Sequence, residues 1–149
     1  MTAPLKKRQE RSLKEYPLRS YDKLRYPDTD RQGHVNNAAF STFLETGRVE
    51  VLYDPANPLA SEHGEFVIAS LKLDYLAEIT YPGRVEIGSG VTKVGTSSFR
   101  FTQALFQQGQ CVATAETVIV QVDDRTRRSS PLSEAARNFL LTLTLPGAA

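Results

Sequence analysis

One stretch of this 149-residue chain, between residues 37 and 52, repeats its large apolar residues at helical spacing. Because an α-helix turns once in 3.6 residues, apolar side chains three or four positions apart form one face that can be buried. That face consists of Phe40, Phe43, Leu44, Gly47 and Val51. Pro55 and Pro58 follow in a turn-rich segment, so the pattern predicts one long helix that ends by about Tyr53.

Most of the remaining chain alternates apolar and polar residues, which is typical of β-strands. We predict strands at about 17–26, 66–80, 84–94, 99–106 and 111–123, and a terminal helix between residues 132 and 143 with Ser130 or Ser133 as its cap. We expect the strand at 66–80 to bury one face. One helix after a first strand, followed by a meander of long strands, indicates an α+β fold in which a curved sheet wraps the helix.

Length and composition are those of one domain. With 40% hydrophobic and 23% charged residues, the chain can bury a core. We assign residues 17–145 to that domain and residues 1–16 to a flexible N-terminal tail. The net charge of +1 provides no bulk attraction to nucleic acid or to a membrane surface. Cys111 is the single cysteine, so it cannot form a disulfide within the chain. The N-terminal residues do not form an apolar run with a cleavage site. Both observations favour a reducing, cytoplasmic setting.

A polar loop leads into the predicted long helix. It brings together the ionisable side chains of Asp28, Asp30 and His34. Asn36 is the candidate N-cap, and the first helical amides, including that of Asn37, then lie at the positive end of the helix dipole. A carboxylate can attack a carbonyl carbon or activate a water molecule, and a helix-terminal amide can stabilise the resulting oxyanion. The combination suggests acyl transfer.

The segment Asp28-Thr29-Asp30-Arg31-Gln32-Gly33-His34-Val35-Asn36-Asn37 resembles the 4-hydroxybenzoyl-CoA thioesterase group of the hotdog-fold thioesterases. Its His-Val-Asn-Asn end is also similar to that of acyl-ACP thioesterases. The resemblance extends over about residues 17 to 125 and implies a hotdog fold, an antiparallel sheet wrapped around one long central helix. It also implies hydrolysis of an acyl-CoA thioester to a carboxylic acid and free CoA, with no metal or other cofactor. Family members commonly form homodimers with active sites at the interface, and often homotetramers.

The resemblance places the catalytic carboxylate at Asp30, acting as nucleophile or general base, and the oxyanion-binding amide at Asn37. The residues alone leave a structural alternative for Asp30, since Asp readily accepts hydrogen bonds from its own turn. His34 is a third catalytic candidate, for polarising the carbonyl or orienting water, although many family members have an apolar residue there. Gly33 would allow the backbone to approach the substrate. Asp28 is then a turn or supporting residue.

The sequence departs from the family at the turn before Phe99. Some relatives have a run of Arg and Lys there that binds the nucleotide phosphates, whereas this chain has Gly95-Thr96-Ser97-Ser98. We therefore assign substrate binding to Ser97 and Ser98, and to Arg127 in the basic segment 125–128, which could equally be a solubilising surface. Loss of the basic run leaves room for an acyl carrier protein as the acyl donor.

Two rival functions stay open beside acyl-CoA or acyl-ACP hydrolysis. One is a non-catalytic hotdog protein that binds acyl thioesters. The other is a hotdog dehydratase, which is disfavoured because no recognisable dehydratase motif is present. Another thioesterase branch places a catalytic Glu on the long helix, where Glu45 lies, but we favour a pair between Glu45 and Arg48 on a solvated helix face.

Overall fold

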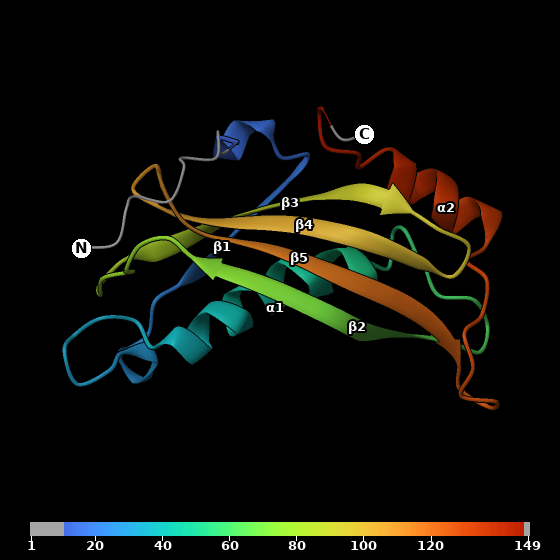
Figure 1. Ribbon diagram of the computed structural model, residues 1–149, viewed down its shortest axis with the longest axis horizontal. Coiled ribbons are helices and arrows are strands. Elements are labelled where there is room, and N and C mark those ends of the chain that lie inside the picture. The colour runs from blue at the N-terminus through green and yellow to red at the C-terminus, as the bar shows by residue number, and fades with distance from the viewer. Residues whose placement is uncertain (1–10, 148–149) are drawn as a thin grey trace.

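The computed structural model describes residues 11–147, which form one five-stranded antiparallel sheet with two α-helices (Figure 1). The strands lie in the order β1-β3-β4-β5-β2. Their bounds are Leu18–Lys23 for β1, Gly64–Tyr75 for β2, Arg84–Val94 for β3, Ser98–Gln107 for β4 and Gln110–Asp123 for β5. The helices are α1, Asn37–Leu52, and α2, Glu134–Leu141. The predicted α+β fold, a sheet wrapped on one long helix, is confirmed.

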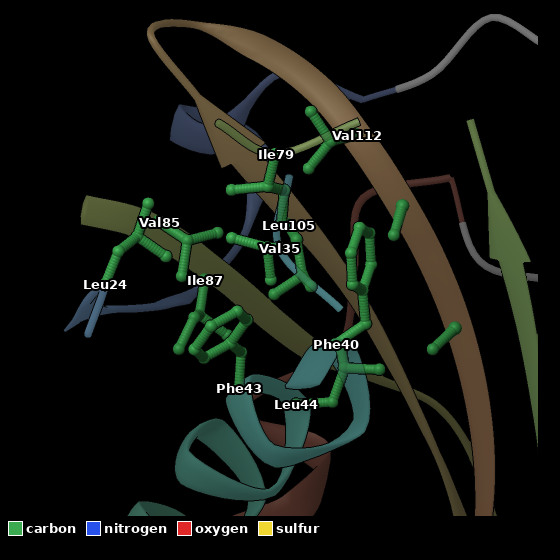
Figure 2. Packing of buried hydrophobic residues seen from close by; sticks show 12 residues of the cluster. Leu24, Val35, Phe40, Phe43, Leu44, Ile79, Val85, Ile87, Leu105 and Val112 are labelled. Atoms are coloured by element: carbon green, nitrogen blue, oxygen red, sulfur yellow. The ribbon is translucent and has the colours of Figure 1, made fainter. Parts of the chain in front are cut away.

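Helix α1 lies along one face of the sheet and contributes three buried side chains to the core between them (Figure 1). Phe40, Phe43 and Leu44 are each at most 2% exposed. In Figure 2 these three side chains point from α1 toward the sheet, where Ile87 of β3 and Leu105 of β4 complete the cluster. The predicted apolar face of the helix is therefore the face that packs on the sheet.

Both ends of α1 form where local chemistry predicts them. Asn36 has an extended backbone, and its side-chain oxygen accepts a hydrogen bond from the Ala38 amide at 3.0 Å. At the other end the amide of Tyr53 donates to the carbonyl of Val49, two residues before Pro55. The predicted N-cap and the predicted end of the helix are confirmed.

The folded part of the chain begins before residue 17. Residues Leu13–Glu15 form the 3-10 turn η1, and Tyr16 is 3% exposed on the sheet face opposite α1. The Tyr16 ring meets the ring of Phe106 edge to face, with centroids 6.2 Å apart. Gly88 makes this approach possible, because a Cβ there would lie 2.6 Å from the Tyr16 ring. The rest of the predicted tail, residues 1–10, lies outside the described residues.

Strand β2 differs from its prediction. It lies at the edge of the sheet, pairs only with β5, and leaves Val67, Ile68, Leu71 and Tyr75 between 38% and 51% exposed. The expectation that one face of this strand is buried is wrong for the single chain, because α1 packs mainly on β1, β3 and β4, toward the other edge of the sheet. The strand also ends at Tyr75, since the next two amides, of Leu76 and Ala77, both donate to the carbonyl of Val112.

The C-terminal segment closes the end of the sheet away from the polar loop. Helix α2 is capped by Ser133, whose hydroxyl accepts from the Ala136 amide at 3.0 Å. The chain then runs beside β3, with the Val91 amide donating to Leu143 and the Leu145 amide donating to Val91. Within residues 11–147, no helix is long and apolar enough to cross a membrane.

Candidate active site

A cleft of about 410 Å³ opens where the polar loop meets the N-terminus of α1. Its walls come from the loop, from the first turn of α1, and from the end of β2 with the segment that follows it. Asp30, His34 and Asn37 all line this cleft, together with Tyr75 and Glu78. The fold thus brings the three predicted catalytic residues to one place.

The side chain of Asp30 has one oxygen bound by its own loop. Oδ1 accepts hydrogen bonds from the amides of Gln32, at 2.8 Å, and His34, at 3.2 Å. Gly33, with φ of 81°, allows the tight turn between them, in a backbone conformation that other residues rarely adopt. Oδ2 accepts no hydrogen bond from the described part of the chain, and Asp30 is exposed in the cleft. The loop therefore fixes the carboxylate through Oδ1 and leaves Oδ2 available for a substrate.

Asn37 is the first helical residue of α1 and lines the cleft. The amides of Ala38 and Ala39 are occupied, by the side chain and the carbonyl of Asn36 respectively. The amide of Asn37 has no acceptor among residues 11–147, and it lies at the positive end of the helix dipole. A carbonyl oxygen that enters the cleft can accept this hydrogen bond.

Tyr75 fixes the end of β2 to the beginning of α1. Its hydroxyl donates to the carbonyl of Asn37 at 3.2 Å, and its ring lies 5.0 Å from that of Phe40, edge to face. These contacts hold the two sides of the cleft together across 38 residues of sequence. The helix N-terminus is thereby fixed relative to the sheet.

The imidazole of His34 contacts the carboxylate of Glu78, a residue that the sequence patterns do not single out. The imidazole Nε2 lies 3.1 Å from the Glu78 carboxylate, whose side chain is 69% exposed. The other nitrogen, Nδ1, is buried and has no hydrogen-bond partner in the described residues. Glu78 lies inside the segment predicted as strand, and the one signal for it was a lone carboxylate within the apolar run Leu76-Ala77-Glu78-Ile79.

Asp28 supports the loop and does not line the cleft. Its carboxylate pairs with the Arg25 guanidinium at 3.0 Å and also accepts from the Arg25 amide. Its carbonyl accepts from the amide of Asn36 at 2.7 Å, which closes the loop against the helix cap. This placement agrees with the turn role expected for Asp28.

The three remaining predicted substrate-binding residues lie at the opposite end of the sheet. Ser98 pairs with Val120 of β5, whereas Tyr75, beside the cleft, pairs with Ala113. Seven residues of strand separate the two levels, which corresponds to about 23 Å at roughly 3.3 Å per residue. Ser97 precedes Ser98, and Arg127 is at the same end, where it contacts Glu65 at 3.4 Å. Within one chain the fold does not bring these residues to the cleft.

The helix residue Arg48 contradicts its prediction. It is 5% exposed, so the expected pair with Glu45 on a solvated face is wrong. Burial lowers the pKa of Arg48, an effect that the charge of Glu45 partly offsets. Its Nη1 has no hydrogen-bond partner among the described residues.

Among residues 11–147, no group of three or more His, Cys, Asp or Glu side chains is arranged to hold a metal ion.

Residues 24–140 match the thioesterase-like superfamily. The acyl-CoA thioester hydrolase YbgC of Escherichia coli is 29% identical over 116 residues, which cover 75% of this chain and 84% of the relative. The 1,4-dihydroxy-2-naphthoyl-CoA hydrolase of Synechococcus elongatus is 28% identical over 122 residues, 78% of this chain and 90% of that enzyme. A solved thioesterase from Thermus thermophilus, in complex with coenzyme A and Zn, is 30% identical with a TM-score of 0.74, over 87% and 95% of the two chains. With its hotdog arrangement of sheet and helix, this chain belongs to the thioesterase-like superfamily.

Proposed function

We propose that this protein hydrolyses acyl-CoA thioesters to a carboxylic acid and free CoA, with Asp30 as the reacting carboxylate. The observation that carries the proposal is that Asp30 and Asn37 line one cleft, and that neither Oδ2 of Asp30 nor the Asn37 amide has a hydrogen-bond partner among the described residues. The names of the relatives, an acyl-CoA thioester hydrolase and a naphthoyl-CoA hydrolase, support this substrate class. We extend the proposal to a reducing, cytoplasmic setting and to a reaction without a metal or redox cofactor.

The chemistry follows from the two groups. The thioester oxygen accepts a hydrogen bond from the Asn37 amide, and the helix dipole stabilises the negative charge that develops on that oxygen. Oδ2 of Asp30 then attacks the carbonyl carbon to give a mixed anhydride, or takes a proton from a water molecule that attacks instead. In both routes the carbon–sulfur bond breaks and CoA leaves as a thiolate that is then protonated.

The decisive variant is Asp30→Asn, assayed by release of free thiol from acyl-CoA substrates. The amide oxygen of Asn can still accept the two loop hydrogen bonds, but Asn can neither attack a thioester nor take a proton. We expect kcat/KM to fall by about 100-fold or more. Asp54→Asn is the matched control, because Asp54 also accepts from a loop amide, that of Ala56, but lies outside the cleft. If Asp30→Asn matches an active wild type, Asp30 is not the reacting carboxylate. If both proteins release thiol only at the background rate, acyl-thioester binding without catalysis is left as the function.

In oxygen-18 water, label on the Asp30 carboxylate would identify the anhydride route, because water that attacks the Asp30 carbon of the anhydride leaves its oxygen there. Water that attacks the acyl carbon places the label in the product alone, as direct attack of water on the thioester also does. Trapping of the acylated Asp30 by rapid quench and mass spectrometry is therefore the complementary measurement. An acylated enzyme requires the anhydride route.

We further propose that the active unit is a homodimer formed through β2. An edge strand has unpaired backbone donors and acceptors, and this one also exposes Ile68 and Leu71 at 50% and 39%. A second copy that adds its own β2 antiparallel, about a two-fold axis, would continue the sheet and cover these side chains. In that arrangement the beginning of one β2 lies beside the end of the other. Glu65 and its partner Arg127 would then approach the cleft of the second copy.

The double variant Ile68→Lys with Leu71→Lys tests the dimer. We expect the wild-type mass in light scattering to be that of a dimer, and the variant to be monomeric with lower activity because the CoA-binding side of the cleft is lost. Leu141→Lys is the control, since Leu141 is 53% exposed on α2. A fully active wild-type monomer at micromolar concentration would contradict the proposal.

A further inference from the structure

The cleft contains a second carboxylate, and the proposed hydrolysis gives it a task that Asp30 cannot perform. Asp30 and Glu78 are the two acidic residues among those that line the cleft. If Asp30 attacks the thioester, its carboxylate becomes part of a mixed anhydride and can no longer accept a proton. The water that hydrolyses the anhydride therefore needs another base within reach.

The contact between His34 and Glu78 shows how that second carboxylate is held. Nε2 of His34 lies 3.1 Å from Glu78 Oε2, within hydrogen-bond distance. Glu78 follows the end of β2, and its side chain is 69% exposed. Among the described residues, the contact with His34 is the one that restrains its carboxylate. The histidine itself is fixed by its backbone, which exchanges hydrogen bonds with Asp30 and forms a bridge with Thr80.

The surroundings of His34 decide which nitrogen carries the proton. Nδ1 is buried and has no acceptor among residues 11–147. A proton on Nδ1 would be a buried donor without a partner, which is costly, whereas a proton on Nε2 is donated to Glu78. The neutral ring is therefore the Nε2–H tautomer. In that form His34 is a hydrogen-bond donor and has no accessible basic nitrogen for water.

We infer that Glu78, positioned by His34, is the general base of the second half of the reaction, and that Asp30 is the nucleophile; this inference rests on the proposed thioester hydrolysis. In the first step the Asp30 oxygen bonds to the acyl carbon, the carbon–sulfur bond breaks, and CoA leaves as a thiolate. In the second step a water oxygen bonds to the acyl carbon while one water proton passes to Glu78. The bond between that carbon and Asp30 breaks, the carboxylic acid leaves, and Glu78 passes its proton to the thiolate.

Glu78→Gln tests the base directly. The substitution keeps the side-chain shape and the acceptor for His34 but removes the ability to take a proton. Because position 78 is exposed, the substitution should not unfold the protein, so lost activity would report on the base. We expect kcat to fall by about 100-fold, and enzyme carrying the acyl group on Asp30 to accumulate in rapid-quench mass spectrometry. Glu62→Gln is the control, because Glu62 is an exposed glutamate outside the cleft.

The positioning role of His34 is tested by measurements that a purely structural role would leave unchanged. His34→Phe removes the donor and should lower kcat by about tenfold in the wild-type background but cause no further loss in Glu78→Gln. His34→Gln, which retains a side-chain N–H, should recover part of the rate. In a His63→Asn background, which leaves His34 as the one histidine, nitrogen-15 NMR should report the Nε2–H tautomer, and Glu78→Leu should change the tautomer population.

The outcomes distinguish this inference from the proposed function. If Asp30→Asn abolishes hydrolysis while Glu78→Gln stays within twofold of wild type and no acyl-enzyme accumulates, the assignment of Glu78 is overturned and thioester hydrolysis stands. If the wild-type protein hydrolyses no acyl-CoA, both fail. An Nδ1–H tautomer in wild type would also overturn the role given to His34.

Discussion

The side-chain amide of Gln103 in β4 donates a hydrogen bond to the backbone carbonyl of Leu44 in α1 at 3.0 Å. Gln103 is fully buried and donates a second hydrogen bond to the Ser89 hydroxyl at 3.1 Å. One polar side chain in the middle of the core therefore joins the sheet to the backbone of the helix that carries the Asn37 amide. The position of the helix on the sheet, and hence of its N-terminus in the cleft, depends on this contact.

Replacing Gln103 with Leu removes both hydrogen bonds and leaves the buried Ser89 hydroxyl without this donor. We expect the free energy of unfolding to fall by about 1–3 kcal/mol, measured by urea denaturation at fixed protein concentration. Gln110→Leu, at an exposed position in β5, should remain within about 0.5 kcal/mol of wild type. Equal stabilities for the two variants would show that the Gln103 contact does not hold the helix.

Gly47→Ala should destabilise the protein even though alanine favours helices. A Cβ at position 47 would lie 2.6 Å from Gln103 Nε2 and 2.9 Å from Ile87 Cγ2, both closer than side chains normally pack. The helix propensity gain of up to about 1 kcal/mol is outweighed by an overlap that costs about 1–3 kcal/mol. In a Gln103→Ala background the cost should shrink, because the nearest clashing atom is removed. A gain in melting temperature for Gly47→Ala alone would contradict the packing described.

The cap of α1 offers a test that links stability to the site. Asn36→Ala removes the acceptor of the Ala38 amide and should cost about 1 kcal/mol. We also expect kcat to fall severalfold, because fraying of the first turn displaces the Asn37 amide. Asn36→Ser keeps a capping oxygen and should preserve both quantities. Thermal unfolding and thiol release report them separately, and unchanged kcat in a measurably destabilised Asn36→Ala would argue against Asn37 as the oxyanion donor.

Arg127 is expected to recognise the nucleotide phosphates of CoA from the second subunit. Arg127→Ala should raise KM for an acyl-CoA while leaving the hydrolysis of an acyl-pantetheine, which lacks those phosphates, unchanged. Arg84→Ala is the control, because Arg84 is an exposed arginine at the beginning of β3. Equal effects on both substrates would contradict the assignment of Arg127 to phosphate binding and would favour the solubilising role.

Tyr16 provides a pH-dependent signature of the packing on the outer face of the sheet. Burial raises the pKa of its phenol from 10.0 to about 12. The folded state therefore keeps the neutral phenol where the unfolded chain ionises, so the contribution of Tyr16 to stability is complete below about pH 10 and is lost as the pH rises toward 12. Absorbance at 295 nm should show a late-titrating tyrosine, and Tyr16→Phe should remove it.

Helix α1 and its loop could be predicted because the signals are local. The helix requires only apolar spacing along one segment, and its Asn36 cap requires a hydrogen bond between residues two apart. The turn role anticipated for Asp30 also follows from its neighbours, since the loop amides that bind Oδ1 lie within four residues. The grouping of Asp30, His34 and Asn37 in one cleft is a consequence of this short segment.

Contacts between distant segments were decided by the tertiary structure alone. Nothing near His34 in the sequence indicates Glu78, because the two meet only when the chain after β2 returns to the loop, 44 residues later. Arg48 has the local pattern of a solvated residue, yet the position of α1 on the sheet buries it. The exposure of β2 could not be predicted for the same reason. Alternation along a strand shows which residues share a face, but the fold of the whole chain determines which elements cover that face.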